Sequence, residues 1–465
     1  MCPSPRFVSP LPRYIPPSRR VQSRRGAVGL VLITLLAVLA PRLDAATIVV
    51  DSSSDQLASD TRCTLREAVA SANQDMALFG CTTGSGPDTI VLDFSGKVAF
   101  LSLAGSVEDD NQTGDLDVKD DLTIRSASPD NMLTIDADGI DRVLDVFDGV
   151  DLTLEDVQIS GGSIIAGNGG GIFVRESGTL LHLINTRVLG NTAPLFGGGI
   201  FATGPVTIEG SLIESNEAAI GGGIYLSDDD VLTLDGSRVN SNRATSDGAG
   251  IAVLRLVARD STIAKNRADR DGGGILWRRI GASAANVSSM VNSTVAENSS
   301  FRDGAGLLFE SPGILELANV TVAWNIADED FDDVGTGGGL VVTDGQVRAR
   351  NTLIASNFDV VIGGASLTPS DCVGTLDSQG TNLIGAVDAG CTITGTTVGN
   401  VTGTVGSPVD AELACLAQIG LGPGTVVPSV SSPVVDAGAV AGCLDVGGGF
   451  LDVDQRGHLR PWDGP

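Results

Sequence analysis

The sequence predicts an all-β fold in which short parallel strands stack as the turns of one coil, because two phrases repeat in step along the chain. The first phrase reads GGGI, GAGI, GAGL or GGGL and occurs seven times between residues 169 and 340, at intervals of 24 to 33 residues. The second phrase ends in asparagine, as in GSLIESN and NSTVAEN. Self-similarity with such a period is typical of stacked structural units.

The two phrases occupy fixed places in the repeat. The glycine phrases begin at Gly169, Gly197, Gly221, Gly248, Gly272, Gly304 and Gly337. The asparagine phrases end at Asn191, Asn216, Asn242, Asn266, Asn298, Asn325 and Asn357. We expect both the glycines and the asparagines to lie at corners with positive φ, and the asparagine side chains to bond to one another along the coil.

Each repeat holds strands and turns but no helix. Apolar residues alternate with polar ones inside the asparagine phrase, and alternation over so short a run indicates a strand. The repeat has no room for a crossover helix of about a dozen residues, which excludes a doubly wound sheet. We therefore expect neighbouring turns to pair in parallel around a dry core filled by Val, Ile, Leu and Ala.

The phrases resemble the GGAI and FxxN repeats of polymorphic outer-membrane proteins and the wider right-handed parallel β-helix, or pectin-lyase-like, group. The resemblance covers about residues 150–360, where Leu, Ile or Val replaces the Phe of FxxN. It implies a right-handed parallel β-helix, which we place at residues 91–400. Motifs built from Gly and Asn specify a fold far better than a function.

Residues 1–45 read as a secretory signal peptide. An Arg-rich start precedes a 14-residue apolar run from Ala27 to Ala40, and small residues near Ala45 offer a cleavage site. Removing this segment takes away seven basic residues and one acidic residue, so the net charge changes from −28 to −34. A charge of that size argues against nucleic acid as a partner. We expect a secreted or cell-surface protein, associated with the outer membrane, without an integral span after cleavage.

Residues 46–90 are predicted to form an N-terminal cap around CTLREAVASAN, which runs from Cys63 to Asn73. Thr64 and Glu67 have the spacing of a capping box, and the apolar residues that follow share one helical face. We expect a short helix that covers the open end of the coil. This role accounts for Arg66 and Glu67 without catalysis.

The two ends of the chain also resemble a named family. CTLREA is similar to the CSLREA motif of secreted bacterial proteins, and TGDLDVKDDLTI and IDRVLDV further along look like that family too. Residues 401–465 are expected to form a C-terminal cap or tail. The stretches DCVGTLDSQGTNLIG, SPVVDAG and DQRGHLRP near this end resemble the C-terminal region often found with that family. That region usually continues further, so the resemblance implies a truncated C-terminus.

Six cysteines remain when Cys2 leaves with the signal peptide, and an even number in an exported chain indicates disulfides. Six cysteines allow fifteen connectivities. The local pairs Cys63–Cys81, Cys372–Cys391 and Cys415–Cys443 are favoured, because they would staple the two ends of the coil.

A basic segment stands out in this acidic chain. Residues 238–302 carry ten basic and five acidic residues. Arg255 and Arg279 occupy the same place after their glycine phrases, and Arg243 and Arg267 each follow a repeat asparagine, so each pair is expected on adjacent turns. Like charges opposite each other are destabilising. The arginines therefore need either acidic neighbours, which is the structural alternative, or an anionic ligand such as an acidic glycan.

The candidate binding residues follow from these two clusters of charge. For the glycan they are Arg243, Arg255, Arg267, Trp277, Arg278 and Arg279, with Trp277 as a face on which a sugar could stack. For calcium, which prefers oxygen ligands, they are Asp328, Asp330, Asp332 and Asp333; a solvated acidic loop is the alternative.

No catalytic residue can be nominated. Neither His182 nor His458 has the GHG context of polygalacturonase-like sites. The leading hypothesis is an exported, non-catalytic surface or extracellular protein that presents a β-helical face for adhesion or for binding an acidic glycan or a cell-surface ligand. Two alternatives remain, a polysaccharide lyase that acts on acidic glycans and a structural envelope protein.

Overall fold

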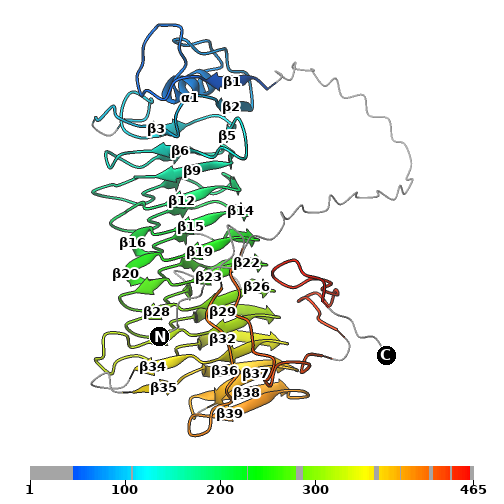
Figure 1. The fold of residues 1–465 in the computed structure, drawn as a ribbon. Coiled ribbons are helices and arrows are strands. Elements are labelled where there is room, and N and C mark those ends of the chain that lie inside the picture. Colours follow the sequence, from blue (N-terminus) through cyan, green and yellow to red (C-terminus); the bar gives the residue numbers. More distant parts are fainter. Residues whose placement is uncertain are drawn as a thin grey trace, which may run out of the picture.

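Successive turns of the chain stack into a parallel β-helix (Figure 1). The computed structural model describes residues 45–460 except for 106–107, 228, 279–285, 361–365, 388, 418–422 and 440–441. The predicted signal peptide therefore lies almost wholly outside the described residues. The all-β coil that the repeats predict is confirmed, with three sheets along its sides.

Sheet A consists of two columns of strands that merge toward the C-terminal end. One column contains β1 (Thr47–Val50), β2 (Asp88–Leu92), β5 (Leu122–Ser126), β8 (Leu152–Glu155), β11 (Leu181–Ile184), β14 (Val206–Glu209), β18 (Val231–Asp235), β22 (Arg255–Arg259) and β26 (Val287–Val291). The other contains β4 (Leu116–Val118), β7 (Leu144–Val146), β10 (Ile172–Val174), β13 (Ile200–Ala202), β17 (Ile224–Leu226), β21 (Ile251–Val253) and β25 (Ile275–Arg278). Both join at β29 (Leu307–Ala318), which is followed by β32 (Leu340–Arg350), β36 (Cys372–Gln379) and β38 (Cys391–Thr396).

Two further sheets form the other sides of the coil: sheet B begins at Val98, and sheet C begins only at Glu217. Sheet B contains β3 (Val98–Phe100), β6 (Leu133–Asp136), β9 (Val157–Ser160), β12 (Arg187–Leu189), β15 (Leu212–Glu214), β19 (Arg238–Asn240), β23 (Thr262–Ala264), β27 (Thr294–Ala296), β30 (Thr321–Ala323), β33 (Leu353–Ala355), β37 (Leu383–Val387) and β39 (Val401–Thr404). Sheet C contains β16 (Glu217–Ile220), β20 (Arg243–Asp247), β24 (Arg267–Ala268), β28 (Ser299–Ser300), β31 (Ile326–Ala327), β34 (Phe358–Val360) and β35 (Leu367–Pro369). The β34–β35 pair is antiparallel.

The repeated glycines and asparagines have different tasks at the corners. The first glycine of every phrase has φ between +63° and +76°, as predicted. The expectation of positive φ for the asparagines is wrong, because that conformation belongs to the residue before each of them: Gly190, Ser215, Ser241, Lys265, Glu297, Trp324 and Ser356. The asparagines are buried, and their side chains bond from turn to turn, which confirms the predicted stack.

The N-terminal end is closed by α1 (Leu65–Asn73), which packs against β1, β2 and β4. Its predicted capping box is present, with Thr64 as N-cap and Glu67 as the third helical residue. The helix thus covers the edges of the first strands, which would otherwise be open to pairing with other chains. Among the described residues, no helix is long and apolar enough to cross a membrane.

Two of the three favoured disulfides are confirmed. Cys63–Cys81 ties the cap, and Cys372–Cys391 links β36 to β38 near the other end. The pair Cys415–Cys443 is wrong, since Cys443 is a free thiol and Cys415 takes part in a different disulfide. Residues on either side of Cys415 contact the corner after sheet B, at Trp324 and Glu297, whereas Cys443 lies beside Asn351, at the corner before that sheet.

The tail that was expected as a C-terminal cap runs back along the flank of the coil (Figure 1, orange to red). The carbonyl oxygen of Gly424 accepts a hydrogen bond from Thr262 on β23, and Gln455 reaches the same threonine. Leu444 and Val453 contact corner asparagines of intervening turns. The tail thus fastens several turns together from outside.

Candidate functional site

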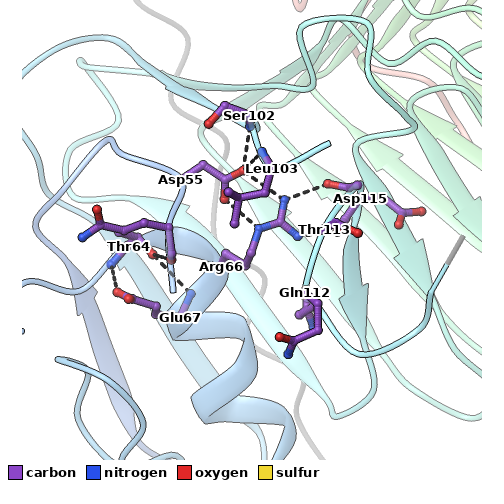
Figure 2. A network of polar contacts seen from close by, with 12 residues as sticks. Asp55, Thr64, Arg66, Glu67, Ser102, Leu103, Gln112, Thr113 and Asp115 are labelled. Carbon is purple, nitrogen blue, oxygen red and sulfur yellow. Dashed lines mark hydrogen bonds and ion pairs between the residues drawn. The ribbon is translucent and has the colours of Figure 1, made fainter. Parts of the chain in front are cut away.

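Arg66 is a structural residue of the cap (Figure 2). Its guanidinium is fully buried, and its Nε lies 2.7 Å from Oδ1 of Asp55. It also donates to the backbone carbonyls of Gly114 (2.7 Å) and Asp115 (2.9 Å), which precede β4. Arg66 therefore joins the helix to the first turns of the coil, and its hydrogen bonds leave no open face toward solvent.

Glu67 is also used by the fold. Its two carboxylate oxygens accept from the backbone N–H groups of Ala58 (2.7 Å) and Thr64 (3.0 Å). Arg66 and Glu67 are the two charged residues of CTLREA. Their roles in packing and helix capping agree with the prediction from the sequence. We find no acid–base pair open to a substrate at this motif.

Beneath the cap, three carboxylates lie close together, and two of them pair with one guanidinium. Asp109, Asp117 and Asp145 each place an oxygen within 4.8 Å of the others, and Asp117 lies opposite Asp145 on adjacent turns. Arg175 lies 2.6 Å from Asp109 and 2.8 Å from Asp145. Burial raises the pKa of Asp117 to about 6. Arg175 supplies a positive charge to Asp109 and Asp145, whereas Oδ1 of the buried Asp117 has no hydrogen-bond partner among the described residues.

The predicted row of arginines exists, but acidic neighbours neutralise it. Arg243 and Arg267 lie opposite each other on β20 and β24, as the repeat predicted. Arg243 pairs with Glu217 (2.8 Å) and Asp269 (2.5 Å). Arg267 pairs with Glu329 (3.1 Å). The repulsion between the two arginines is thus offset by carboxylates on their own and neighbouring turns, without a ligand.

Arg278 is enclosed even more fully. It contacts three carboxylates, those of Glu310 (2.6 Å), Asp247 (2.8 Å) and Asp271 (3.2 Å). Three carboxylates are more than enough to balance the single positive charge of Arg278. Neutralisation by acidic neighbours therefore accounts for this residue without an anionic ligand.

The expected stack of Arg255 on Arg279 is wrong. Val257 pairs with Ser289, so the strand next to β22 begins at Val287. Residues between β25 and β26 form an insertion that shifts the register, and Arg279 itself lies outside the described residues. Arg255 donates instead to the backbone carbonyl of Asp229 (3.2 Å).

Trp277 cannot offer a face to a sugar. Its side chain is fully buried in the core, where its ring meets that of Phe309 edge-on with centroids 5.8 Å apart. It occupies the inward position held by Val253 on the previous turn. The sequence prediction placed Trp277 beside Arg278 correctly, but successive residues of a strand point to opposite faces.

The acidic loop after β31 brings three of its four predicted ligands together. Asp328, Asp330 and Asp332 each place one carboxylate oxygen within 4.8 Å of the others. The carboxylate of Asp333 is not part of this group; its backbone N–H donates to Oδ2 of Asp328 over 3.1 Å.

A groove that the sequence did not indicate lies on the outer face of sheet A, at the C-terminal end of the coil. Its volume is about 380 Å³, and it is lined by Glu316, Leu317, Ala318, Arg348, Arg350, Asp377, Gln379 and Val446. Strands β29, β32 and β36 supply all of these residues except Val446, which belongs to the tail. The groove exists because the tail folds back along the coil. The position of the tail could not be predicted from the repeats.

Charged side chains form the floor of the groove. Glu316, Arg348 and Asp377 lie opposite one another on three successive turns. Arg348 is 3.5 Å from Glu316 and 3.6 Å from Asp377. Arg350 donates to the carbonyl of Asp445 (3.3 Å) and has no carboxylate within ion-pair distance in the described part of the chain. Of the two guanidiniums in the groove, that of Arg350 therefore has no ion-pair partner among the described residues.

Comparisons with known proteins identify the architecture alone. The family model described as a right-handed beta helix region matches residues 148–398. No curated protein and no solved structure matches the chain.

Proposed function

We propose that this chain, which belongs to the right-handed β-helix family, is an exported surface or extracellular protein that binds an acidic glycan in the groove beside Arg350. The observation that carries the proposal is Arg350 itself. A guanidinium that has no carboxylate partner among the described residues, in a groove lined mostly by polar side chains, favours a ligand that brings its own carboxylate. The site proposed from the sequence thereby moves from the arginines of residues 243–279 to β32.

The lining of the groove suits a sugar chain. Pockets of about 300–1,000 Å³ are usual for small ligands, and this groove lies in that range. Glu316, Asp377 and Gln379 can exchange hydrogen bonds with hydroxyl groups, while Arg348 holds the two carboxylates in place. Val446, which is only partly buried, adds apolar surface for the face of a sugar ring.

Export is supported by the signal-like residues 1–45 and by the two disulfides, Cys63–Cys81 and Cys372–Cys391, which persist in oxidising compartments. The similarity of CTLREA to the CSLREA motif, and of the repeats to polymorphic outer-membrane proteins, adds support for a role at the cell surface in adhesion. These resemblances do not identify the ligand.

A polysaccharide lyase is the second candidate, and one observation favours it. Arg350 shares the groove with Glu316 and Asp377, so a basic group and carboxylates lie together, as lyase chemistry on uronic acids requires. A structural envelope protein would instead leave the groove without a ligand.

The test is calorimetric titration of the protein with polygalacturonate and alginate at low salt. We expect binding that is at least about tenfold weaker in Arg350→Gln, since a charge-assisted pair is lost. Arg302→Gln, which removes the same charge at an exposed position away from the groove, is the control and should bind as the wild type does.

Three results separate the candidates. Binding without release of unsaturated, ultraviolet-absorbing products supports the binding protein, and release of such products supports the lyase. Absence of binding to every acidic glycan tested, or equal binding by Arg350→Gln, would overturn the proposed site.

A further inference from the structure

Two clusters of three carboxylates lie among the described residues, and they differ in the basic groups beside them. In the cluster beneath the cap, Arg175 lies between Asp109 and Asp145. In the loop after β31, no Lys, Arg or His of the described chain lies within ion-pair distance of Asp328, Asp330 or Asp332. Arg267, two turns away on β24, pairs with Glu329 of this loop at 3.1 Å.

Asp328 provides an independent observation at the same place. Its side chain is buried, with 1% of its surface exposed, yet its Oδ1 has no hydrogen-bond partner. Its other oxygen accepts from the backbone N–H of Asp333. A buried carboxylate oxygen without a partner costs free energy unless a cation or donor meets it.

The three carboxylates of the loop lie close enough to interact, with one oxygen of each within 4.8 Å of the others. The three carboxylates repel one another, and a bound cation would relieve that repulsion.

We propose that Asp328, Asp330 and Asp332 bind one calcium ion, which fastens the loop between β31 and β32 to the body of the coil. The alternating spacing of the three residues and the buried, unpartnered oxygen of Asp328 carry the assignment. The site lies on sheet C, and it does not depend on the proposed function of the groove.

Calcium fits this site better than other common cations. It takes six to eight oxygen ligands in flexible geometry, and backbone carbonyls and water can complete a set begun by three carboxylates. Magnesium demands near-ideal octahedral geometry and gives up its water reluctantly. Zinc prefers Cys and His ligands, and this loop, residues 328–336, contains neither.

The experiment uses the full chain, freed of metal with a chelator and titrated with calcium chloride by calorimetry, with melting followed in parallel. We expect binding heat and a rise in Tm, because an ion that binds only the folded loop stabilises it. Asp332→Asn should weaken binding at least about tenfold, since affinity follows the number of charged ligands. Asp328→Asn should do the same.

The controls keep the outcome clear. Asp344→Asn removes an exposed carboxylate on β32 and should leave binding unchanged. Asp332 is exposed, so its variant reports on the site even where Asp328→Asn folds poorly. A wild-type protein with neither heat nor a shift in Tm would overturn the proposal, as would Asp332→Asn that binds calcium as tightly as the wild type.

Discussion

Asn216 and Asn242 lie one turn apart, and Oδ1 of Asn242 accepts two hydrogen bonds from Asn216, one from its backbone N–H and one from its side-chain amide, each 3.0 Å long. Asn242 in turn donates the same two hydrogen bonds, from its backbone N–H and its side-chain amide, to Oδ1 of Asn266. Each asparagine side chain thus satisfies the backbone N–H of the asparagine on the preceding turn, while the backbone carbonyl of Asn216 accepts from the N–H of Arg243 on the next turn. Asp371 ends the ladder, because its carboxylate accepts from Asn357.

Asn242→Leu should lower the free energy of unfolding by roughly 3 kcal/mol, since it removes the buried acceptor of the backbone N–H and one side-chain N–H of Asn216 and the side-chain donor to the carbonyl of Ile213. Chemical denaturation measures the change. Ser177→Leu, at an exposed turn, is the control and should change stability by less than about 0.5 kcal/mol. Equal losses in the two variants would contradict a role for the ladder.

Arg66→Met should destabilise the cap by about 3–5 kcal/mol, because it leaves the carboxylate of Asp55 buried and uncompensated. Adding Asp55→Asn to this variant should restore part of the loss, as the remaining buried group is then neutral. Hydrogen exchange of the α1 amides would show whether the effect is local. A double variant no more stable than Arg66→Met would contradict the ion-pair explanation.

The repeat made the coil predictable because each turn reuses the same local chemistry. Glycines with positive φ, alternating apolar residues and the asparagine stack follow from short-range rules. The pairing of Arg243 with Arg267 on adjacent turns was predicted by counting residues from the repeated asparagine. The same counting gave the wrong partner for Arg255, because extra residues between β25 and β26 interrupt the repeat.

The groove could not be predicted for a different reason. Arg348 and Arg350 meet Val446, which follows them by about a hundred residues, through a tail that contains no repeat. The place of that tail depends on scattered contacts such as that between Asn319 and Leu444. By contrast, the acidic loop could be nominated, since Asp328, Asp330 and Asp332 are close in sequence and converge locally.

Trp277→Ala should cost about 3–5 kcal/mol of stability, the usual loss for a large aromatic side chain in a core. Trp277→Phe should retain most of the stability, because Nε1 of Trp277 has no hydrogen-bond partner to lose. Thermal melting compares the two. Loss of glycan binding in Trp277→Ala with an unchanged Tm would instead restore a sugar-stacking role.

The cap should be more stable in mild acid than in mild base. Burial raises the pKa of Asp115 to about 8, despite Arg142, and that of Asp117 to about 6, both from usual values near 4. Between about pH 4 and pH 8 the folded state therefore binds more protons than the unfolded state, so the free energy of unfolding falls as pH rises. This contribution is complete below about pH 4 and is lost as pH rises through about 6 for Asp117 and about 8 for Asp115. Hydrogen exchange of the α1 amides at pH 5 and at pH 8.5 measures this difference in stability. The difference should be smaller in Asp117→Asn and unchanged in the control variant Asp344→Asn. A cap whose amides become better protected as pH rises would contradict this account.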